Sequence, residues 1–273
     1  MSGAPSDRRS RSPLTVLADG VEQAGFMLVL LGQAARSMLV PRSPRRAWGR
    51  FVDQLYTQMV KSLVVVVTVG SFTGMVLALQ IGEELRRYGG EDFLGSVVAA
   101  TLCREMGPFI TAIILAATVG GSIAAELGTM RVSEEIDAIE LMNIDPVAFL
   151  VTPRIVALTV SAVLLTALVD VVGVLGGAVV AHSHYGVLYS DYFSSARGTL
   201  SADALVWILP KDIYSGLVKA WIFGLLVGAL GCGSGLQASG GALGVGKAVR
   251  TAVVASIVVV LIVGYVITWF FWA

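Results

Sequence analysis

The chain has 273 residues, of which 56% are hydrophobic and only 14% are charged, against roughly 25% charged residues in an ordinary soluble domain. The 19 Lys and Arg residues are balanced by 19 Asp and Glu residues, so the basic surplus of a nucleic-acid-binding protein is missing. The mean hydropathy of +0.81 excludes a soluble globule of this size. Composition therefore predicts an all-α, polytopic membrane protein with one domain.

The first 61 residues are expected to lie beside the membrane or on its surface. Residues 1–13 are polar and Arg/Ser-rich, which is typical of a disordered tail, and no apolar stretch with a cleavage site follows them as in a signal peptide. Residues 14–39 have an apolar centre too short to cross about 30 Å of hydrocarbon, which favours an amphipathic interfacial helix. Residues 45–61 are expected to form a second amphipathic helix, an elbow before the first span.

The remaining residues, 62–273, contain five apolar stretches long enough to span a membrane. Each holds about 20 residues or more, and they cover residues 62–82, 106–125, 155–181, 220–246 and 251–273. The last third of the fourth stretch is Gly-rich and is expected to be a loop. A shorter apolar piece, residues 93–103, is expected to be a helical lead-in that meets the second span at a kink, with a re-entrant element as the alternative.

The distribution of basic residues predicts the orientation. Most of the 19 Lys and Arg residues fall on the inner side when the N-terminus is placed in the cytoplasm, as the positive-inside rule requires. Five spans then place the C-terminus outside, where the closing Trp-Phe-Phe-Trp suits an aromatic belt. They also place residues 126–154, between the second and third spans, on the cytoplasmic face.

The segment 126–154 has the pattern of a short surface helix. Ser133 is expected to cap its N-terminus, with Glu134 and Glu135 in the first turn, where the helix dipole favours acids. Asp145-Pro146 is expected to end it. Pattern alone leaves open a solvated connector or a docking helix whose apolar and acidic faces meet a cytoplasmic partner; these faces are formed by Ile136, Ile139 and Met142, and by Asp137 and Glu140.

Small residues recur at four-residue spacing in the apolar stretches, which lets helices approach closely. The same spacing joins Gly70 with Gly74, Gly173 with Gly177 and Gly224 with Gly228. It indicates packing, within the chain or in a homodimer. The longest ladder lies in the second span and comprises Ala112, Ala116, Gly120, Ala124 and Gly128.

Ionisable residues at membrane depth are candidates for function because they are costly to bury. Asp170, Arg104, Glu105 and Lys219 fall in or next to the apolar stretches and could meet polar head groups of a lipid. The alternatives are a structural acid for Asp170 and a local ion pair between Arg104 and Glu105. A second functional hypothesis is an ion-coupled secondary carrier that acts alone, with Asp170 as its proton or ion site. The sequence contains no repeat of paired broken helices that would support it.

Catalysis within this chain is not expected. Residues 241–248, GALGVGKA, match a P-loop only as far as GxxxxGK, because Ala248 lacks the hydroxyl that holds Mg²⁺ and no strand precedes them. A Gly-rich cytoplasmic loop is the preferred interpretation. Neither HExxH nor GxSxG occurs, and Cys103 and Cys232 are expected to be buried small hydrophobes that bind no metal.

A set of short motifs makes the middle of the chain distinctive. They are Arg104-Glu105-Met106-Gly107-Pro108, AAELGTM at 124–130, EIDA at 135–138, Ile144-Asp145-Pro146 and Pro153-Arg154. These motifs resemble the MlaE permease family, the membrane subunit of MCE-associated ABC lipid transporters, and the resemblance runs from about Trp48 to the end of the chain. Two departures are Thr118, where the family often has Arg, and Gly264-Tyr265, where it often has an acid in the last span.

The resemblance implies a permease in the bacterial inner membrane that moves phospholipid or a related lipid to or from a periplasmic MCE-domain carrier. It implies a homodimer that encloses a lipid cavity and a separate cytoplasmic ABC ATPase, which holds the ATP and Mg²⁺. This chain then needs no cofactor of its own. Residues 133–142 become the coupling helix, and the residues expected to contact the ATPase are Glu126, Ser133, Glu134, Glu135, Asp137 and Glu140.

Overall fold

A computed structural model of the chain describes residues 25, 32, 44–202, 204–206 and 209–272. The tail over 1–13 and, apart from residues 25 and 32, the interfacial helix expected over 14–39 lie outside these residues. Five helical stretches are long and apolar enough to span a membrane, which confirms the polytopic all-α fold. They are Trp48–Arg87, Glu91–Val132, Val147–Tyr185, Lys211–Leu236 and Gly241–Phe271.

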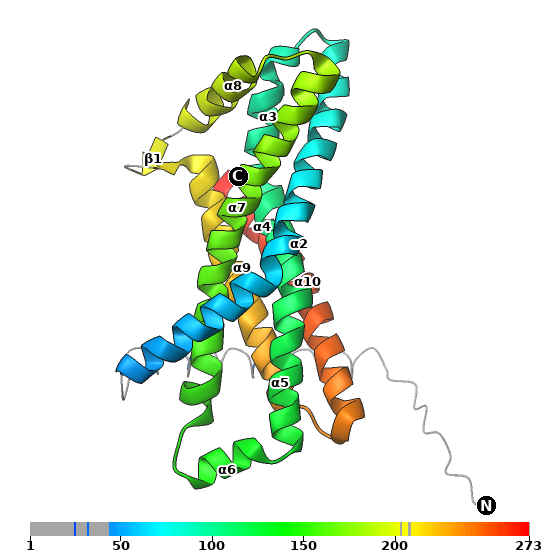
Figure 1. Cartoon of the computed structure of the whole chain (residues 1–273). Helices are drawn as coiled ribbons and strands as arrows, with labels where there is room; N and C mark the ends of the chain where they lie inside the picture. Colours follow the sequence, from blue (N-terminus) through cyan, green and yellow to red (C-terminus); the bar gives the residue numbers. More distant parts are fainter. Residues whose placement is uncertain (1–24, 26–31, 33–43, 203, 207–208, 273) are drawn as a thin grey trace, which may run out of the picture.

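The elbow and the first span form one continuous helix, α2 (Pro44–Arg87). Figure 1 shows its first part running obliquely and the rest turning along the bundle. The expected boundary at residue 61 therefore does not end a helix, because no helix breaker interrupts the backbone hydrogen bonds there.

The second span is a stack of helical pieces that begins with a 3₁₀ turn and alternates between α-helix and π-helix. Its order is η1 (Glu91–Phe93), α3 (Leu94–Thr101), η2 (Leu102–Met106), α4 (Gly107–Leu115), η3 (Ala116–Gly120) and α5 (Gly121–Val132), with η2 and η3 π-helical. The lead-in over 93–103 is confirmed as helical, and it joins the span through a π turn just before Pro108. The stack runs on in one direction (Figure 1), which excludes the re-entrant alternative.

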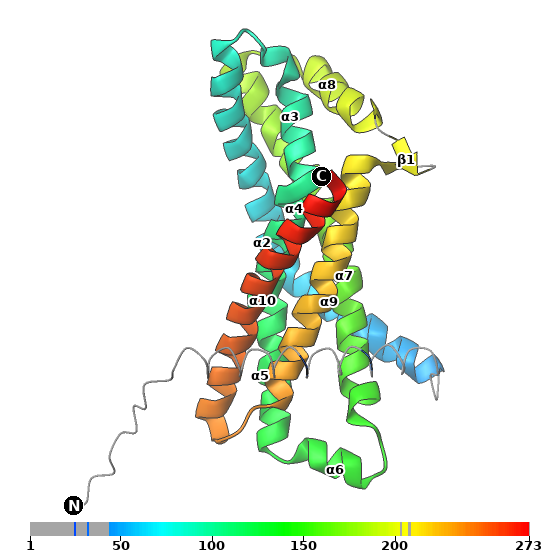
Figure 2. The ribbon, with the colours of Figure 1, turned by 180° about the vertical axis from the view of Figure 1, so that it is seen from behind.

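Two short helices mark the two ends of the bundle (Figures 1 and 2). At the α6 end lie α6 (Glu135–Leu141) and η4 (Val147–Val151), between α5 and α7 (Thr152–Tyr185). At the α8 end, α8 (Tyr189–Ala202) packs on α3. A two-stranded ribbon, β1 (Ala204–Val206) with β2 (Leu209–Pro210), precedes α9 (Lys211–Leu236) and α10 (Gly241–Trp272).

The fourth span begins earlier than expected, and the predicted Gly-rich loop is found only over residues 237–240; its extension to residue 246 is wrong. Helix α9 already begins at Lys211, and only residues 237–240 separate it from α10. The backbone turns at Gly240 and Gly241, whose φ angles are +84° and +73°, a region that glycine adopts without strain. The remaining glycines of the P-loop-like run lie in the first turns of α10.

The small residues pack helices within the chain. A Cβ at Gly74 would overlap the Gly173 carbonyl oxygen, so α2 and α7 touch backbone to backbone. The ladder of the second span is buried against α9 and α10, where Gly120 faces Val227 of α9 and Gly128 faces Val245 of α10. Both cysteines are buried and free, as expected.

Candidate functional site

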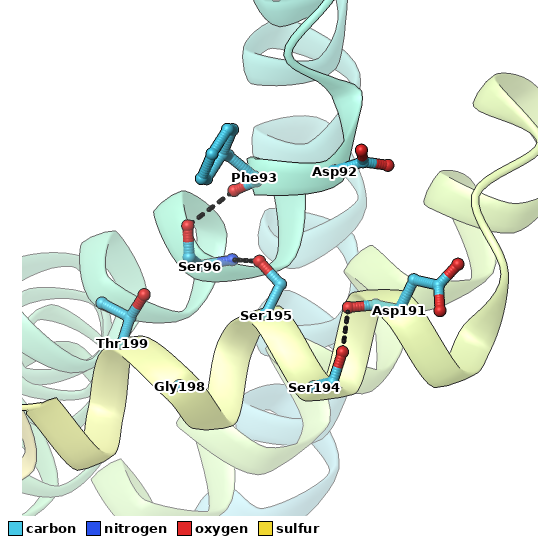
Figure 3. Close-up of a pocket in the computed structure, with 8 residues that line it drawn as sticks. All are labelled: Asp92, Phe93, Ser96, Asp191, Ser194, Ser195, Gly198 and Thr199. Carbon is cyan, nitrogen blue, oxygen red and sulfur yellow. Dashed lines mark hydrogen bonds between the residues drawn. The ribbon is translucent and has the colours of Figure 1, made fainter.

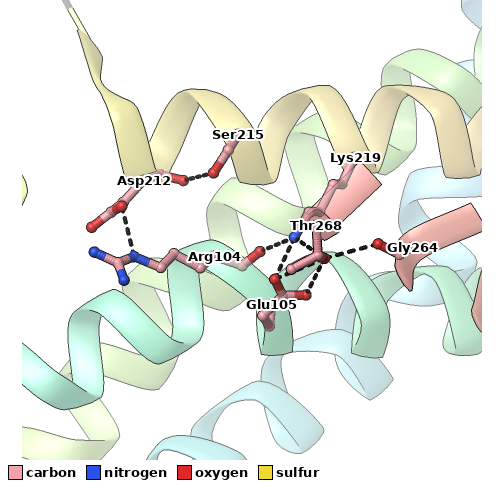
Figure 4. A network of polar contacts seen from close by, with 7 residues as sticks. All are labelled: Arg104, Glu105, Asp212, Ser215, Lys219, Gly264 and Thr268. Atoms are coloured by element: carbon pink, nitrogen blue, oxygen red, sulfur yellow. Dashed lines mark hydrogen bonds and ion pairs between the residues drawn. The ribbon is translucent and has the colours of Figure 1, made fainter. Parts of the chain in front are cut away.

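Lys219 is the centre of a polar cluster inside the bundle (Figure 4). Its side chain, on α9, is 0% exposed. The ammonium donates to Glu105 Oε1 at 2.5 Å, to the Arg104 carbonyl oxygen at 2.9 Å and to Thr268 Oγ1 at 2.9 Å. All three donors of the ammonium are therefore used, and α9 is fastened to η2 and α10 at one point.

The π turn η2 presents its two charged residues to α9. Arg104 Nε donates to Asp212 Oδ1 at 2.7 Å, seven residues before Lys219 on the same helix. Asp212 is buried, and its carbonyl oxygen accepts the Ser215 hydroxyl at 2.9 Å. The Arg104 and Glu105 side chains stay 33% and 28% exposed. The cluster thus joins the fully buried Lys219 ammonium to two charged side chains that remain partly exposed on the surface of the bundle, within an apolar span.

The fifth span closes the cluster through Thr268. Its hydroxyl lies 3.0 Å from Glu105 Oε1 and 2.8 Å from the Gly264 carbonyl oxygen, besides accepting from Lys219. Gly264 makes this approach possible, because a Cβ there would overlap the Phe109 ring. Glycine at position 264 thus leaves room for the ring, and the Thr268 hydroxyl one turn later binds Lys219.

Three of the four lipid-pathway candidates, Arg104, Glu105 and Lys219, come together, and Asp170 does not join them. The sequence left open an ion pair between Arg104 and Glu105, whereas in the structure each binds a residue of α9. Asp212 and Thr268 were missed. Asp212 could have been found, because residues 212, 215, 216, 219 and 223 share one helical face, but the fourth span was expected to begin only at residue 220.

Ser133 does not cap α6 as expected. The N-cap position belongs to Glu134, which takes a left-handed φ of +60°. Ser133 instead ends α5, where its hydroxyl donates to the Thr129 carbonyl oxygen at 2.7 Å and lies 3.1 Å from Glu135 Oε1. The left-handed turn lets α6 leave α5 sharply. Helix α6 also ends at Leu141, before Asp145-Pro146.

Several acids of the segment 126–154 are engaged inside the chain. Glu126 Oε2 accepts from Arg154 at 3.3 Å, which ties the middle of α5 to the start of α7. The Arg154 carbonyl oxygen in turn accepts Gln58 of α2 at 3.4 Å. Asp137 is paired with Arg131. Glu134 and Glu140 are exposed.

The apolar residues in and next to α6 do not share one face as expected: some pack into the core and others are exposed. Ile136 is 3% exposed and packs into the core, and Ile139 packs against the same cluster. Met142, expected on that face, is 64% exposed because it follows the end of the helix, and Leu141 is 89% exposed. The tip of the α6 end is therefore an apolar knob formed by Leu141 and Met142.

The α8 end carries a groove lined largely by hydroxyl groups (Figure 3). Ser195 Oγ accepts the Ser96 amide at 3.2 Å and so fixes α8 to α3. Tyr192 anchors the same helix; it is 1% exposed, and burial raises the pKa of its phenol. The groove is lined by Asp92, Phe93, Ser96, Asp191, Ser194, Ser195, Gly198 and Thr199. Among the described residues no group of His, Cys, Asp and Glu has the arrangement of a metal site.

Comparison with known proteins is consistent with this architecture. The family profile described as Permease MlaE matches residues 51–270. A probable ABC transporter permease protein of Synechocystis sp. is 33% identical, covering 97% of this chain and 95% of that protein. A protein of the same description from Rickettsia prowazekii is 40% identical over 76% of this chain and 77% of its own length.

A third relative has a more specific name. The intermembrane phospholipid transport system permease protein MlaE of Haemophilus influenzae is 31% identical, covering 90% of this chain and 89% of that protein. Within the part of the chain that the structure describes, this profile overlaps each of the five helices that can cross a membrane. The chain is therefore a multi-pass membrane protein that belongs to the MlaE permease family.

Proposed function

We propose that this chain is the permease subunit of an ATP-driven ABC transporter in the bacterial inner membrane. It moves phospholipid or a related lipid between that membrane and a periplasmic MCE-protein carrier. The observation that carries the proposal is the match over residues 51–270, together with the phospholipid-transport name of the Haemophilus relative. ATP and Mg²⁺ belong to a separate ATPase subunit.

The polar cluster supports a lipid path. A transported phospholipid needs apolar walls for its acyl chains and polar groups for its head group. Arg104 and Glu105 keep part of their side chains exposed within an apolar span, where a charge in contact with hydrocarbon is unfavourable. A second copy of the chain placed against the exposed parts of Arg104 and Glu105 encloses a cavity in which those charges meet a head group.

The α6 end supports coupling to the ATPase on the cytoplasmic side. The Arg154–Glu126 pair ties α5 to α7 on either side of α6, so the segment moves together with two spans. The internal pairs of Glu126 and Asp137 leave Leu141 and Met142 as its most prominent side chains. The ATPase therefore receives an apolar knob, with the exposed acids Glu134 and Glu140 at its border.

The α8 end then faces the periplasm. Its groove and the anchored helix α8 lie at the end opposite α6 (Figure 2). A periplasmic carrier that takes up or delivers lipid has to contact this end of the permease.

Reconstitution tests the proposal. The permease is purified with its ATPase and carrier, placed in proteoliposomes, and supplied with a fluorescent phospholipid. Transfer to or from the carrier should require ATP. It should be lost in the double variant Glu105→Gln with Lys219→Met, which removes both charges of the pair. Lipid movement by the permease alone, driven by an ion gradient without ATP, would support a secondary carrier instead and contradict the proposal.

A further inference from the structure

Asp170 is a buried carboxyl group that lacks a hydrogen-bond partner for one of its oxygens. It lies in the middle of α7 and is 8% exposed, and its Oδ1 atom is the unpartnered one. A carboxylate that is neither paired nor fully hydrogen-bonded is strongly unfavourable in an apolar interior. A further species is needed to complete the surroundings of this group.

The carboxyl group lies directly against Gly107, where the π turn η2 gives way to α4. A Cβ at position 107 would overlap Asp170 Oδ1, so only glycine leaves room for the carboxyl group there. A π turn inserts one extra residue into a helix and is frequent at functional sites. The irregular helix and the missing side chain together make space for Asp170 between α4 and α7.

Two threonines, one helical turn away, also have a buried oxygen atom without a hydrogen-bond partner. Thr111 follows Gly107 by four residues on α4, and Thr166 precedes Asp170 by four on α7, so each shares a face with its neighbour. Both hydroxyl oxygens are buried without a hydrogen-bond partner. Because α4 leads into α5 toward α6, and α7 leads away from it, the helices are antiparallel (Figure 1). Both hydroxyls thus lie on the α6 side of Asp170.

The charges of the neighbouring cluster are already engaged. Arg104 binds Asp212 and Lys219 binds Glu105, and no ion pair among the described residues includes Asp170. Neighbouring buried polar atoms without partners are rare in folded proteins, and they indicate bound water or a bound ion. One of these unpartnered oxygens belongs to Asp170, and a buried carboxylate requires a compensating positive charge, so the missing species is a cation.

We infer that the seam between α4 and α7, at Gly107, Thr111, Thr166 and Asp170, binds a monovalent cation, either a proton accompanied by water or Na⁺. The cation neutralises the carboxylate, and the two hydroxyl groups hold it or its water. Both helices continue toward α6, so an occupied site holds together the two spans that flank the α6 segment. The site is separate from the lipid-pathway cluster and does not depend on the transported substrate.

Infrared spectroscopy of the full chain in nanodiscs distinguishes the two cations. If a proton is bound, the difference between wild type and Asp170→Asn contains the C=O stretching band of a protonated carboxyl group, which shifts in D₂O. If Na⁺ is bound, that band is missing, but replacing choline by Na⁺ raises the Tm of the wild type and not of the variant. Asp191→Asn, at an exposed carboxyl group on α8, is the matched control and should leave both signals unchanged.

A second variant keeps the test decisive if Asp170→Asn folds poorly. Thr166→Val retains the shape of the side chain and leaves the carboxyl group in place. It should shift the carboxyl band or weaken the Na⁺ effect, because it removes one oxygen from the site. A protein with neither a protonated-carboxyl band nor a Na⁺-dependent Tm, or with signals that Thr166→Val does not alter, overturns the inference.

Discussion

Lys219 Nζ lies 2.5 Å from Glu105 Oε1, and the two residues differ sharply in their access to solvent. The Lys219 side chain is 0% exposed, whereas 28% of Glu105 is exposed. The ammonium depends on this partner more than the carboxylate does, because the carboxylate can reach the surface if the pair is broken.

The pair should therefore respond asymmetrically to mutation. Glu105→Gln leaves a fully buried ammonium without its counter-charge, a change that costs about 3–5 kcal/mol in buried pairs. Lys219→Met should destabilise less, and the double variant should be more stable than Glu105→Gln alone. Thermal unfolding in detergent measures all three. A double variant less stable than Glu105→Gln would contradict the assigned dependence.

The contact of α2 with α7 should not tolerate a methyl group at Gly74. Gly74→Ala places a Cβ on the Gly173 carbonyl oxygen, so we expect a Tm lower by several degrees or a failure to fold. Gly246→Ala is the matched control. That glycine is in a helix with open space around it, and alanine there should be neutral or should stabilise by up to about 1 kcal/mol. Equal Tm values for the two variants would disprove the close contact.

Arg154 should hold the α6 segment in place. Arg154→Met removes the bond to Glu126 and preserves much of the side-chain volume, so amides over 133–146 should exchange hydrogen faster. Hydrogen exchange with mass spectrometry measures this directly. Glu140→Gln, at an exposed side chain without an ion pair among the described residues, should leave exchange unchanged. Unchanged protection in Arg154→Met would show that other contacts hold the segment.

Cysteine labelling in cells tests the orientation. Cys103 and Cys232 are buried and should remain unlabelled by an impermeant maleimide. Asp92→Cys at the α8 end should be labelled from outside, and Glu140→Cys at the α6 end only after the membrane is opened, because basic residues favour the cytoplasmic side. The reverse pattern would place α6 in the periplasm and remove the basis for coupling to a cytoplasmic ATPase.

The number and order of the spans could be predicted from the sequence because hydropathy and charge act locally. Five uncharged or nearly uncharged stretches predict five spans, and the described residues contain all five. Their ends were less predictable. The sequence ended the fourth span in a Gly-rich loop, whereas Gly241 begins α10, because glycine is compatible with a turn and with a packed membrane helix.

The polar contacts depended on tertiary structure that no local pattern contains. Charge alone identified Arg104, Glu105 and Lys219 as candidates, but the pairing of Arg104 with Asp212 needs the docking of η2 on α9. Similarly, Ser133 has the residue type of an N-cap, and the left-handed turn at Glu134 moves it to the end of α5. Packing decides which of several chemically suitable neighbours a side chain meets.

The most direct test of the account is recovery of the ATPase with variants of the α6 tip. The chain is co-expressed with its ATPase, and the amount of ATPase that co-purifies is measured together with its rate of ATP hydrolysis. Leu141→Ser with Met142→Ser should reduce both at least tenfold, whereas the charge-neutralising control Glu134→Gln with Glu140→Gln should retain most of the binding. Full recovery of a lipid-stimulated ATPase with the serine variant would contradict coupling through this segment.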